Sequence, residues 1–136
     1  MKALRYESQS NPEGPTVVLL RLGLVLSGLS GALGVASLAL SAHAAASALL
    51  ETAAQMLLLH APVFLGLGVL AQIRKVLFLP LVVLLMTAGL TLFCGDMFSR
   101  IILEQRLFSM SAPIGGMLVI LGWLVLALSA LRVRPK

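Results

Sequence analysis

Four long apolar stretches constrain the fold of this chain more than any other feature. Each approaches the length of about 20 largely apolar residues that an α-helix needs to cross a bilayer. We place the four spans at residues 16–41, 49–72, 76–97 and 113–132. Charged residues make up only 11% of the chain, whereas about a quarter is usual in a soluble domain. The sequence therefore predicts an all-α integral membrane protein, a four-helix bundle formed by one domain over residues 16–136.

The basic residues predict how this bundle is oriented. Residues 1–15 carry two prolines and a glycine, which is typical of a short polar tail. Basic residues gather in this tail, in the Arg74–Lys75 turn and at the C-terminus, whereas two arginines on the other side are balanced by two acids. By the positive-inside rule we expect both termini in the cytoplasm (N-in/C-in). The expected location is a bacterial-type inner membrane, with several passes through it.

The second stretch carries polar residues where hydrocarbon is expected. Gln55 and His60 lie within it, and Pro62 follows. A polar side chain at that depth is costly in lipid, so it should face protein, water or a ligand. We predict that Gln55 and His60 form hydrogen bonds across helices and fix their packing. Pro62 cannot donate a hydrogen bond to the carbonyl of Leu58, so a kink is expected there.

Small residues in the first stretch are spaced for close helix packing. Gly23, Ser27 and Gly31 recur every four residues, and Ser30 and Gly34 repeat the pattern. This spacing lets two helix backbones approach each other closely. The partner is either another helix of this chain or a helix of a second copy.

The fourth stretch has features of the same kind. Pro113 belongs to the turn before it, and Gly115, Gly116 and Gly122 indicate close packing. Trp123 can stack on a neighbour or donate its N–H to a buried partner.

Asp96, Arg100 and Glu104 follow one another at intervals of four residues. This spacing predicts a helix that continues past the third apolar run, with alternating charges along one face. We expect a surface ladder of ion pairs at the outer headgroups. The alternative is an ion path that includes Asp96.

A metal or haem site is the sharper alternative for the histidines. Imidazoles bind haem, copper or zinc, so His60 with His43, or with Met56 one turn earlier, is a candidate ligand set. The single cysteine, Cys94, rules out an intramolecular disulfide and a CxxC motif. No acid–base or nucleophile–base pair stands at usable spacing. We therefore expect no enzymatic activity and no cofactor, and the basic residues at span ends do not suggest nucleic acid.

Several motifs resemble those of a known family. GALGVASLALSAHA, QMLLLHA, LTLFCGD and APIGGMLVILGW occur in that order. They resemble the small membrane proteins of domain of unknown function 423, also called transmembrane protein 256-like. The resemblance covers residues 28–131 and implies a four-helix membrane fold with no established activity. The positions that it matches are His43, Gln55, His60, Phe93, Gly95, Pro113, Gly115, Gly116, Gly122 and Trp123.

The chain departs from the family pattern at three positions. Cys94 replaces a serine, Leu59 replaces the tyrosine usual before the histidine, and Asp96 replaces a small polar residue. We expect a protein that acts through helix packing, as a subunit, an assembly factor or a lipid-organising protein. Its expected partners are membrane lipid and either further copies of itself or a larger membrane complex. The alternatives are a metal- or haem-binding protein that uses His60, and an oligomeric small transporter or channel lined by Gln55, His60 and Asp96.

Overall fold

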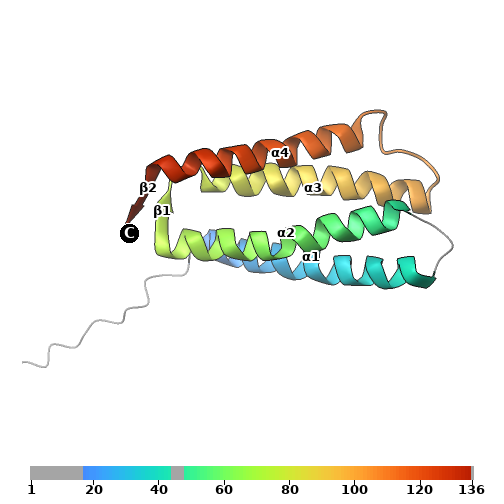
Figure 1. Cartoon of the computed structure of the whole chain (residues 1–136), viewed down its shortest axis with the longest axis horizontal. Helices are drawn as coiled ribbons and strands as arrows, with labels where there is room; N and C mark the ends of the chain where they lie inside the picture. The colour runs from blue at the N-terminus through green and yellow to red at the C-terminus, as the bar shows by residue number, and fades with distance from the viewer. Residues whose placement is uncertain (1–16, 44–47, 136) are drawn as a thin grey trace, which may run out of the picture.

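The computed structural model describes residues 17–43 and 48–135, and most of them are helical (Figure 1). Within these residues, four helices are long and apolar enough to cross a membrane. The prediction of an all-α fold with four such helices is therefore confirmed. The elements in chain order are α1 (Val18–His43), α2 (Ala48–Ile73), β1 (Arg74–Val76), α3 (Leu79–Ile102), α4 (Ser111–Ser129), the 3-10 turn η1 (Ala130–Arg132) and β2 (Val133–Pro135).

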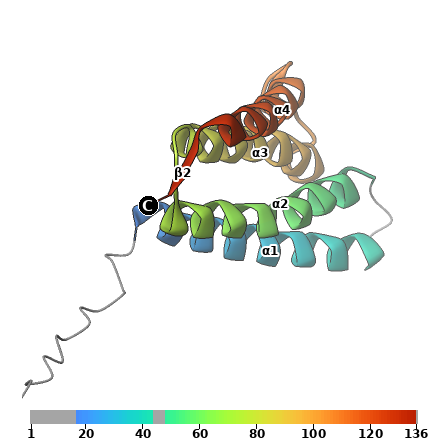
Figure 2. The same ribbon diagram turned by 60° about the vertical axis from the view of Figure 1, so that its left-hand side comes forward.

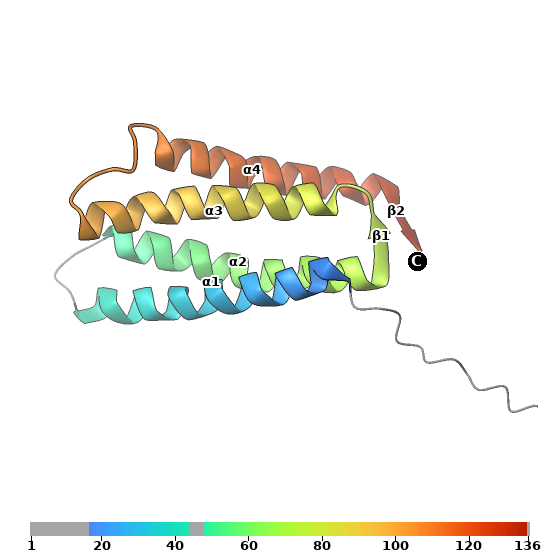
Figure 3. The same ribbon diagram turned by 180° about the vertical axis from the view of Figure 1, so that it is seen from behind.

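The helices form two antiparallel hairpins. α1 packs along α2, α3 packs along α4, and contacts between α2 and α3 join the two pairs. Figures 1 and 3 show all four helices along the long axis of the molecule, and Figure 2 shows the hairpins as two layers. The buried core lies between α2 and α3, with Phe64, Val82 and Met86 among its most enclosed side chains. The outer faces of α1 and α4 expose leucines and valines, which suits contact with acyl chains.

Small residues bring α1 close to α2. A Cβ atom added at Gly23 would lie 2.6 Å from the carbonyl oxygen of Phe64, closer than a side chain can approach. The small-residue face of the first span therefore finds its partner inside the chain. Gly31 and Ser27 are only partly buried. α1 buries four residues, all of them small: Gly23, Ser30, Gly34 and Ser37.

Glycines have the same role between α3 and α4. A Cβ atom at Gly115 would lie 2.6 Å from the backbone nitrogen of Phe93 and 2.7 Å from the carbonyl oxygen of Gly89. At Gly122 it would lie 2.8 Å from the Cγ atom of Met86. These contacts leave no room for a larger residue, so Gly115 and Gly122 set the distance between the two helices.

The helix ends differ from the predicted spans by a few residues. α3 begins at Leu79 instead of residue 76 because the preceding residues form β1, and Pro80 lies in its first turn. There the missing N–H is harmless, since first-turn N–H groups have no partner within the helix. α3 ends at Ile102 instead of residue 97, and α1 continues to His43. His43 is therefore the last residue of α1.

Pro62 lies inside α2 without ending it. The helix is continuous over its 26 residues, and Figure 2 shows its ribbon changing direction about half way along. The lost hydrogen bond to the carbonyl of Leu58 is a physical reason for a bend at this level. The bend turns the first half of α2 toward α3 (Figure 2).

A two-stranded antiparallel ribbon lies at one end of the bundle. β1 connects α2 to α3, and β2 pairs with it, with Val76 opposite Val133 and Lys75 opposite Arg134. The start of α1 is at the same end, where the backbone N–H of Val17 donates to the side-chain oxygen of Gln72 over 3.0 Å. The predicted tail at residues 1–15 lies outside the described residues.

Candidate functional site

His60 is almost completely enclosed, with 1% of its surface exposed. Its Nδ1 atom lies 2.7 Å from the carbonyl oxygen of Met56. A carbonyl only accepts, so Nδ1 carries the hydrogen of this bond. Nε2 is buried and has no hydrogen-bond donor within the described part of the chain. The ring of Trp123 lies against it, with 6.0 Å between ring centroids and a tilt of 59°.

This geometry corrects the predicted role of His60. The bundle shelters the ring, as expected, but the hydrogen bond goes to the preceding turn of the same helix and not to another helix. The physical reason is the helix spacing, because the carbonyl of residue i−4 lies directly beneath the ring. The contact with α4 comes from Trp123, whose ring packs at a tilt against His60 and which has 41% of its surface exposed.

His43 and His60 are not brought together. Ala61 lies beside Gly31, because the Cβ atom of Ala61 would be 3.8 Å from a Cβ at Gly31. His43 is twelve residues further along α1, which corresponds to about 18 Å along a helix. No group of three or more His, Cys, Asp or Glu side chains within residues 17–43 and 48–135 is placed to hold a metal ion. Of the candidate metal ligands, His60 and Met56 therefore lie close together. The backbone carbonyl of Met56 accepts the hydrogen bond from His60.

Gln55 faces away from the bundle. Its side chain is exposed, and it makes no hydrogen bond to any described residue. It lies seven residues after the first residue of α2, about 10 Å along the helix, well inside an apolar span. The predicted hydrogen bond from Gln55 across helices is therefore not formed within the described part of the chain. The inner face of α2 is formed by small and apolar residues on both sides of it, such as Ala54 and Leu57.

Asp96 is fully buried near the end of α3 and is held by three groups. Its Oδ1 atom accepts hydrogen bonds from the hydroxyl of Ser111 and from the backbone N–H of Leu107, the latter over 3.2 Å. Its Oδ2 atom lies 2.5 Å from Nη2 of Arg100. A buried carboxylate needs this kind of compensation, because isolated charge is very costly away from water.

The polar contacts around Asp96 also fix the loop that connects α3 to α4. The hydroxyl of Ser99 donates to the carbonyl of Gln105 over 2.8 Å, and Glu104 has a positive φ of 55°. Such a backbone conformation turns the chain back over the end of α3. The predicted surface ladder is therefore wrong in part: the helix continues past residue 97 and the Asp96–Arg100 pair forms, but Glu104 does not extend it. The helix ends before Glu104. In the Asp96–Arg100 pair the Asp96 side chain is fully buried and the Arg100 side chain is 23% exposed.

The predicted packing and pore residues are placed in different ways. Gly115 is buried between helices, Gly116 is partly buried and Pro113 is exposed in the first turn of α4. Gly31 is partly buried against Ala61. The three predicted pore residues do not line one common path. Gln55 is on an outer face, His60 is in the interior, and Asp96 is bonded to the loop after α3.

Two contacts were missed by the sequence analysis. Gly89 in α3 is the close neighbour of Gly115 in α4. The sequence signal for this contact was a glycine inside the third apolar run, 26 residues before Gly115. Ser111 binds Asp96, but no local pattern pairs residues fifteen positions apart across an irregular loop.

These features define a class of protein, a multi-pass integral membrane protein with a few buried polar groups. Residues 30–116 match the family described as "Protein of unknown function (DUF423)", and the chain belongs to this family. The chain is 25% identical over 123 residues to the UPF0382 inner membrane protein YgdD of Escherichia coli K12 and to that of Shigella flexneri. Each match covers 85% of this chain and 94% of the relative. No solved structure matches the chain.

The resemblance found in the motifs is thereby confirmed, and the protein is a multi-pass inner-membrane protein of an uncharacterised family.

Proposed function

We propose that the protein works without enzymatic activity, as a membrane subunit that associates with a second copy of itself through the outer face of α2. This face consists of Gln55, Leu59, Pro62 and Gly66, which are all exposed. Their spacings of four, three and four residues place them on one stripe of the helix. The exposed amide of Gln55 is the observation that carries the proposal.

A free amide inside a membrane span is unfavourable without a partner. It offers two donors and one acceptor oxygen, and lipid supplies neither. A second copy related by a two-fold axis brings Gln55 opposite Gln55 of that copy, so each amide donates to the other. Polar side chains that bond across helices in this way stabilise membrane helix association by about 1 kcal/mol.

Gly66 supports the same contact. A Cβ atom added there meets nothing within 4 Å, so packing inside the chain does not explain a glycine at this position. Glycine on an outer helix face lets another helix approach closely. Leu59 lies one turn from Gln55 and is 61% exposed. It supplies apolar surface between Gln55 and Gly66.

The test is the monomer–dimer equilibrium of purified protein in detergent, followed by analytical ultracentrifugation. Gln55→Leu is expected to weaken association about fivefold or more, from the loss of about 1 kcal/mol. Thr52→Val is the matched control. Thr52 is also exposed on α2, but its hydroxyl already donates to the carbonyl of Ala48 over 2.6 Å.

A second pair of variants tests the shape of the contact. Gly66→Leu should abolish association by keeping the two helices apart, whereas Gly28→Leu should not, although neither added side chain meets an atom of the same chain at its Cβ. The proposal fails if Gln55→Leu and Gly66→Leu both associate as the unaltered protein does.

A further inference from the structure

Four basic side chains gather around the ribbon at the end of the bundle. Arg74 and Lys75 come from β1, Arg132 from η1 and Arg134 from β2, and all four are exposed. Lys75 lies directly opposite Arg134 in the ladder, where the Cβ atoms of paired residues are about 5 Å apart. Like charges in directly opposite positions destabilise a strand pair. An anion bound beside them would remove this repulsion.

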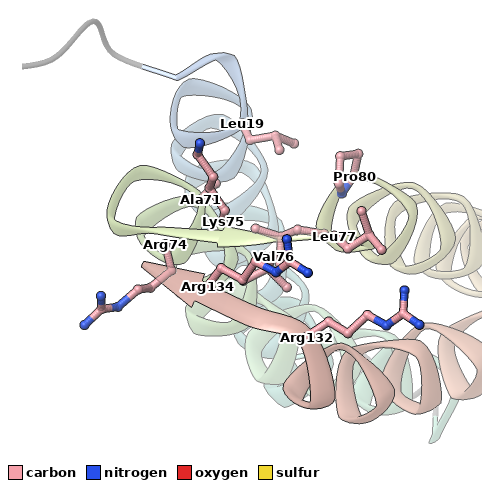
Figure 4. A pocket seen from close by; sticks show the side chains of 10 residues that line it. Leu19, Ala71, Arg74, Lys75, Val76, Leu77, Pro80, Arg132 and Arg134 are labelled. Carbon is pink, nitrogen blue, oxygen red and sulfur yellow. The ribbon is translucent and has the colours of Figure 1, made fainter. Parts of the chain in front are cut away.

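A cavity of about 480 Å³ lies beside these cations. The four basic residues line one part of it, and the rest is mainly apolar, with Leu19 from α1, Ala71 from α2 and Pro80 from α3 (Figure 4). Its volume is within the range of about 300–1,000 Å³ that is typical of small-molecule sites. One wall is therefore suited to anionic oxygens and the other to hydrocarbon.

The acidic side chains of the described residues lie far from this cavity. Glu51 is in the first turn of α2, Asp96 is near the end of α3 and Glu104 follows that helix. The cavity is formed at the other ends of both helices, where α2 finishes and α3 begins. None of the three carboxylates can therefore neutralise the four cations.

Exposed apolar residues surround the basic cluster. Ile73, Leu77 and Leu131 have 57%, 58% and 82% of their surfaces exposed. Apolar side chains beside guanidinium and ammonium groups at the end of a membrane span place this region at the level of the lipid headgroups. A ligand that enters the cavity there has a charged part and an apolar part.

We propose that this cavity binds the headgroup of an anionic phospholipid that carries two phosphate groups. In Figure 4 the charged ends of Arg74, Lys75 and Arg132 point in three different directions around the ribbon. A single small phosphate cannot meet all of them, whereas two linked phosphates cover a wider area. Arginine forms paired hydrogen bonds with phosphate oxygens, and the acyl chains run along the apolar wall beside Leu19 and Leu77.

The experiment measures lipid binding to the full chain in detergent by mass spectrometry under non-denaturing conditions. Cardiolipin, which has two phosphates, is compared with phosphatidylglycerol, which has one, and with zwitterionic phosphatidylcholine. We expect cardiolipin to bind at least about tenfold more tightly than phosphatidylglycerol, since additional basic contacts near an anionic headgroup each contribute. Soluble inorganic pyrophosphate distinguishes a lipid site from a site for free phosphate, and it should not displace the lipid at equal concentration.

Charge-removing variants locate the site. Lys75→Gln with Arg134→Gln should weaken cardiolipin binding about 30-fold, the usual contribution of two basic residues near an anionic surface. Arg132→Gln, outside the strand ladder, tests the same site if that double variant does not fold. Arg21→Gln is the control, because Arg21 is exposed near the same end of α1 but does not line the cavity.

Three results would overturn the proposal. These are equal binding of cardiolipin and phosphatidylglycerol, displacement of cardiolipin by pyrophosphate, and equal loss of binding in Arg21→Gln and the cavity variants. The site lies at the opposite end of α2 from Gln55, so its test does not depend on association of two copies.

Discussion

The hydroxyl of Ser111 at the start of α4 donates its hydrogen to the buried carboxylate of Asp96, which lies fifteen residues earlier in α3. The hydroxyl is also 2.9 Å from the carbonyl oxygen of Phe108, but it has one hydrogen. The carboxylate is the stronger acceptor because it is charged. This bond links the ends of two helices that are joined by an irregular loop, so Asp96 organises the turn of the second hairpin.

Removal of the Asp96 carboxylate is expected to destabilise the protein strongly. In Asp96→Ala the Arg100 guanidinium loses its counter-charge, and Ser111 and the N–H of Leu107 lose their acceptor. Removal of one partner of a buried pair costs about 3–5 kcal/mol. Because Arg100 is partly exposed, we expect the free energy of unfolding to fall by about 3 kcal/mol. Unfolding by sodium dodecyl sulfate in mixed micelles measures it.

Two further variants test this assignment. Asp96→Ala combined with Arg100→Ala should be more stable than Asp96→Ala alone, because no unpaired cation remains. Glu104→Gln should change the free energy of unfolding by less than about 0.5 kcal/mol, since this side chain is exposed and outside the helix. An equal loss from Glu104→Gln and Asp96→Ala would contradict the role given to Asp96.

Two glycines should respond in opposite ways to an added methyl group. Gly115→Ala places a Cβ atom 2.6 Å from the backbone nitrogen of Phe93, so α3 and α4 must move apart, at a cost of about 1–3 kcal/mol. Gly28→Ala meets nothing within 4 Å and should stabilise α1 by about 0.5–1 kcal/mol, because alanine restricts the unfolded chain. The same unfolding measurement compares them, and equal effects would show that α3 and α4 are not in close contact at Gly115.

The sequence predicted the four spans because hydropathy and length fix them, and it predicted close packing because glycines and serines recur at helical spacing. It could not predict which side of α2 faces inward. In a membrane both the protein core and the lipid favour apolar residues. The hydropathy pattern therefore does not reveal that Gln55 faces outward and His60 faces inward. The Asp96–Ser111 bond was missed for another reason, since it depends on the backbone turn at Glu104.

Replacement of His60 tests whether its buried Nε2 atom has a partner that lies outside the described residues. If it has none, His60→Leu removes an unsatisfied polar atom and one bond to Met56, and the free energy of unfolding should change by less than about 1 kcal/mol. Phe64→Ala, at a position that is equally enclosed, should cost about 3–5 kcal/mol. A loss above about 2 kcal/mol in His60→Leu would show that Nε2 has such a partner. A haem absorption band or bound metal in the pure protein, lost in His60→Leu, would make His60 a ligand.

Cysteine labelling tests the expected orientation, with both termini in the cytoplasm. Cys94 has 3% of its surface exposed, and its thiol lies near the carbonyl of Ala53, so it should not react in the folded protein. A membrane-impermeant maleimide is applied to spheroplasts, in which the outer membrane has been removed and the inner membrane is intact. It should label Gln105→Cys, in the loop after α3, and not Ser10→Cys. The physical reason is the excess of Lys and Arg near the termini and the β1 turn, which resist transfer across the membrane. Labelling of Ser10→Cys alone would show the opposite orientation, and the lipid-binding cavity would then face the periplasmic side.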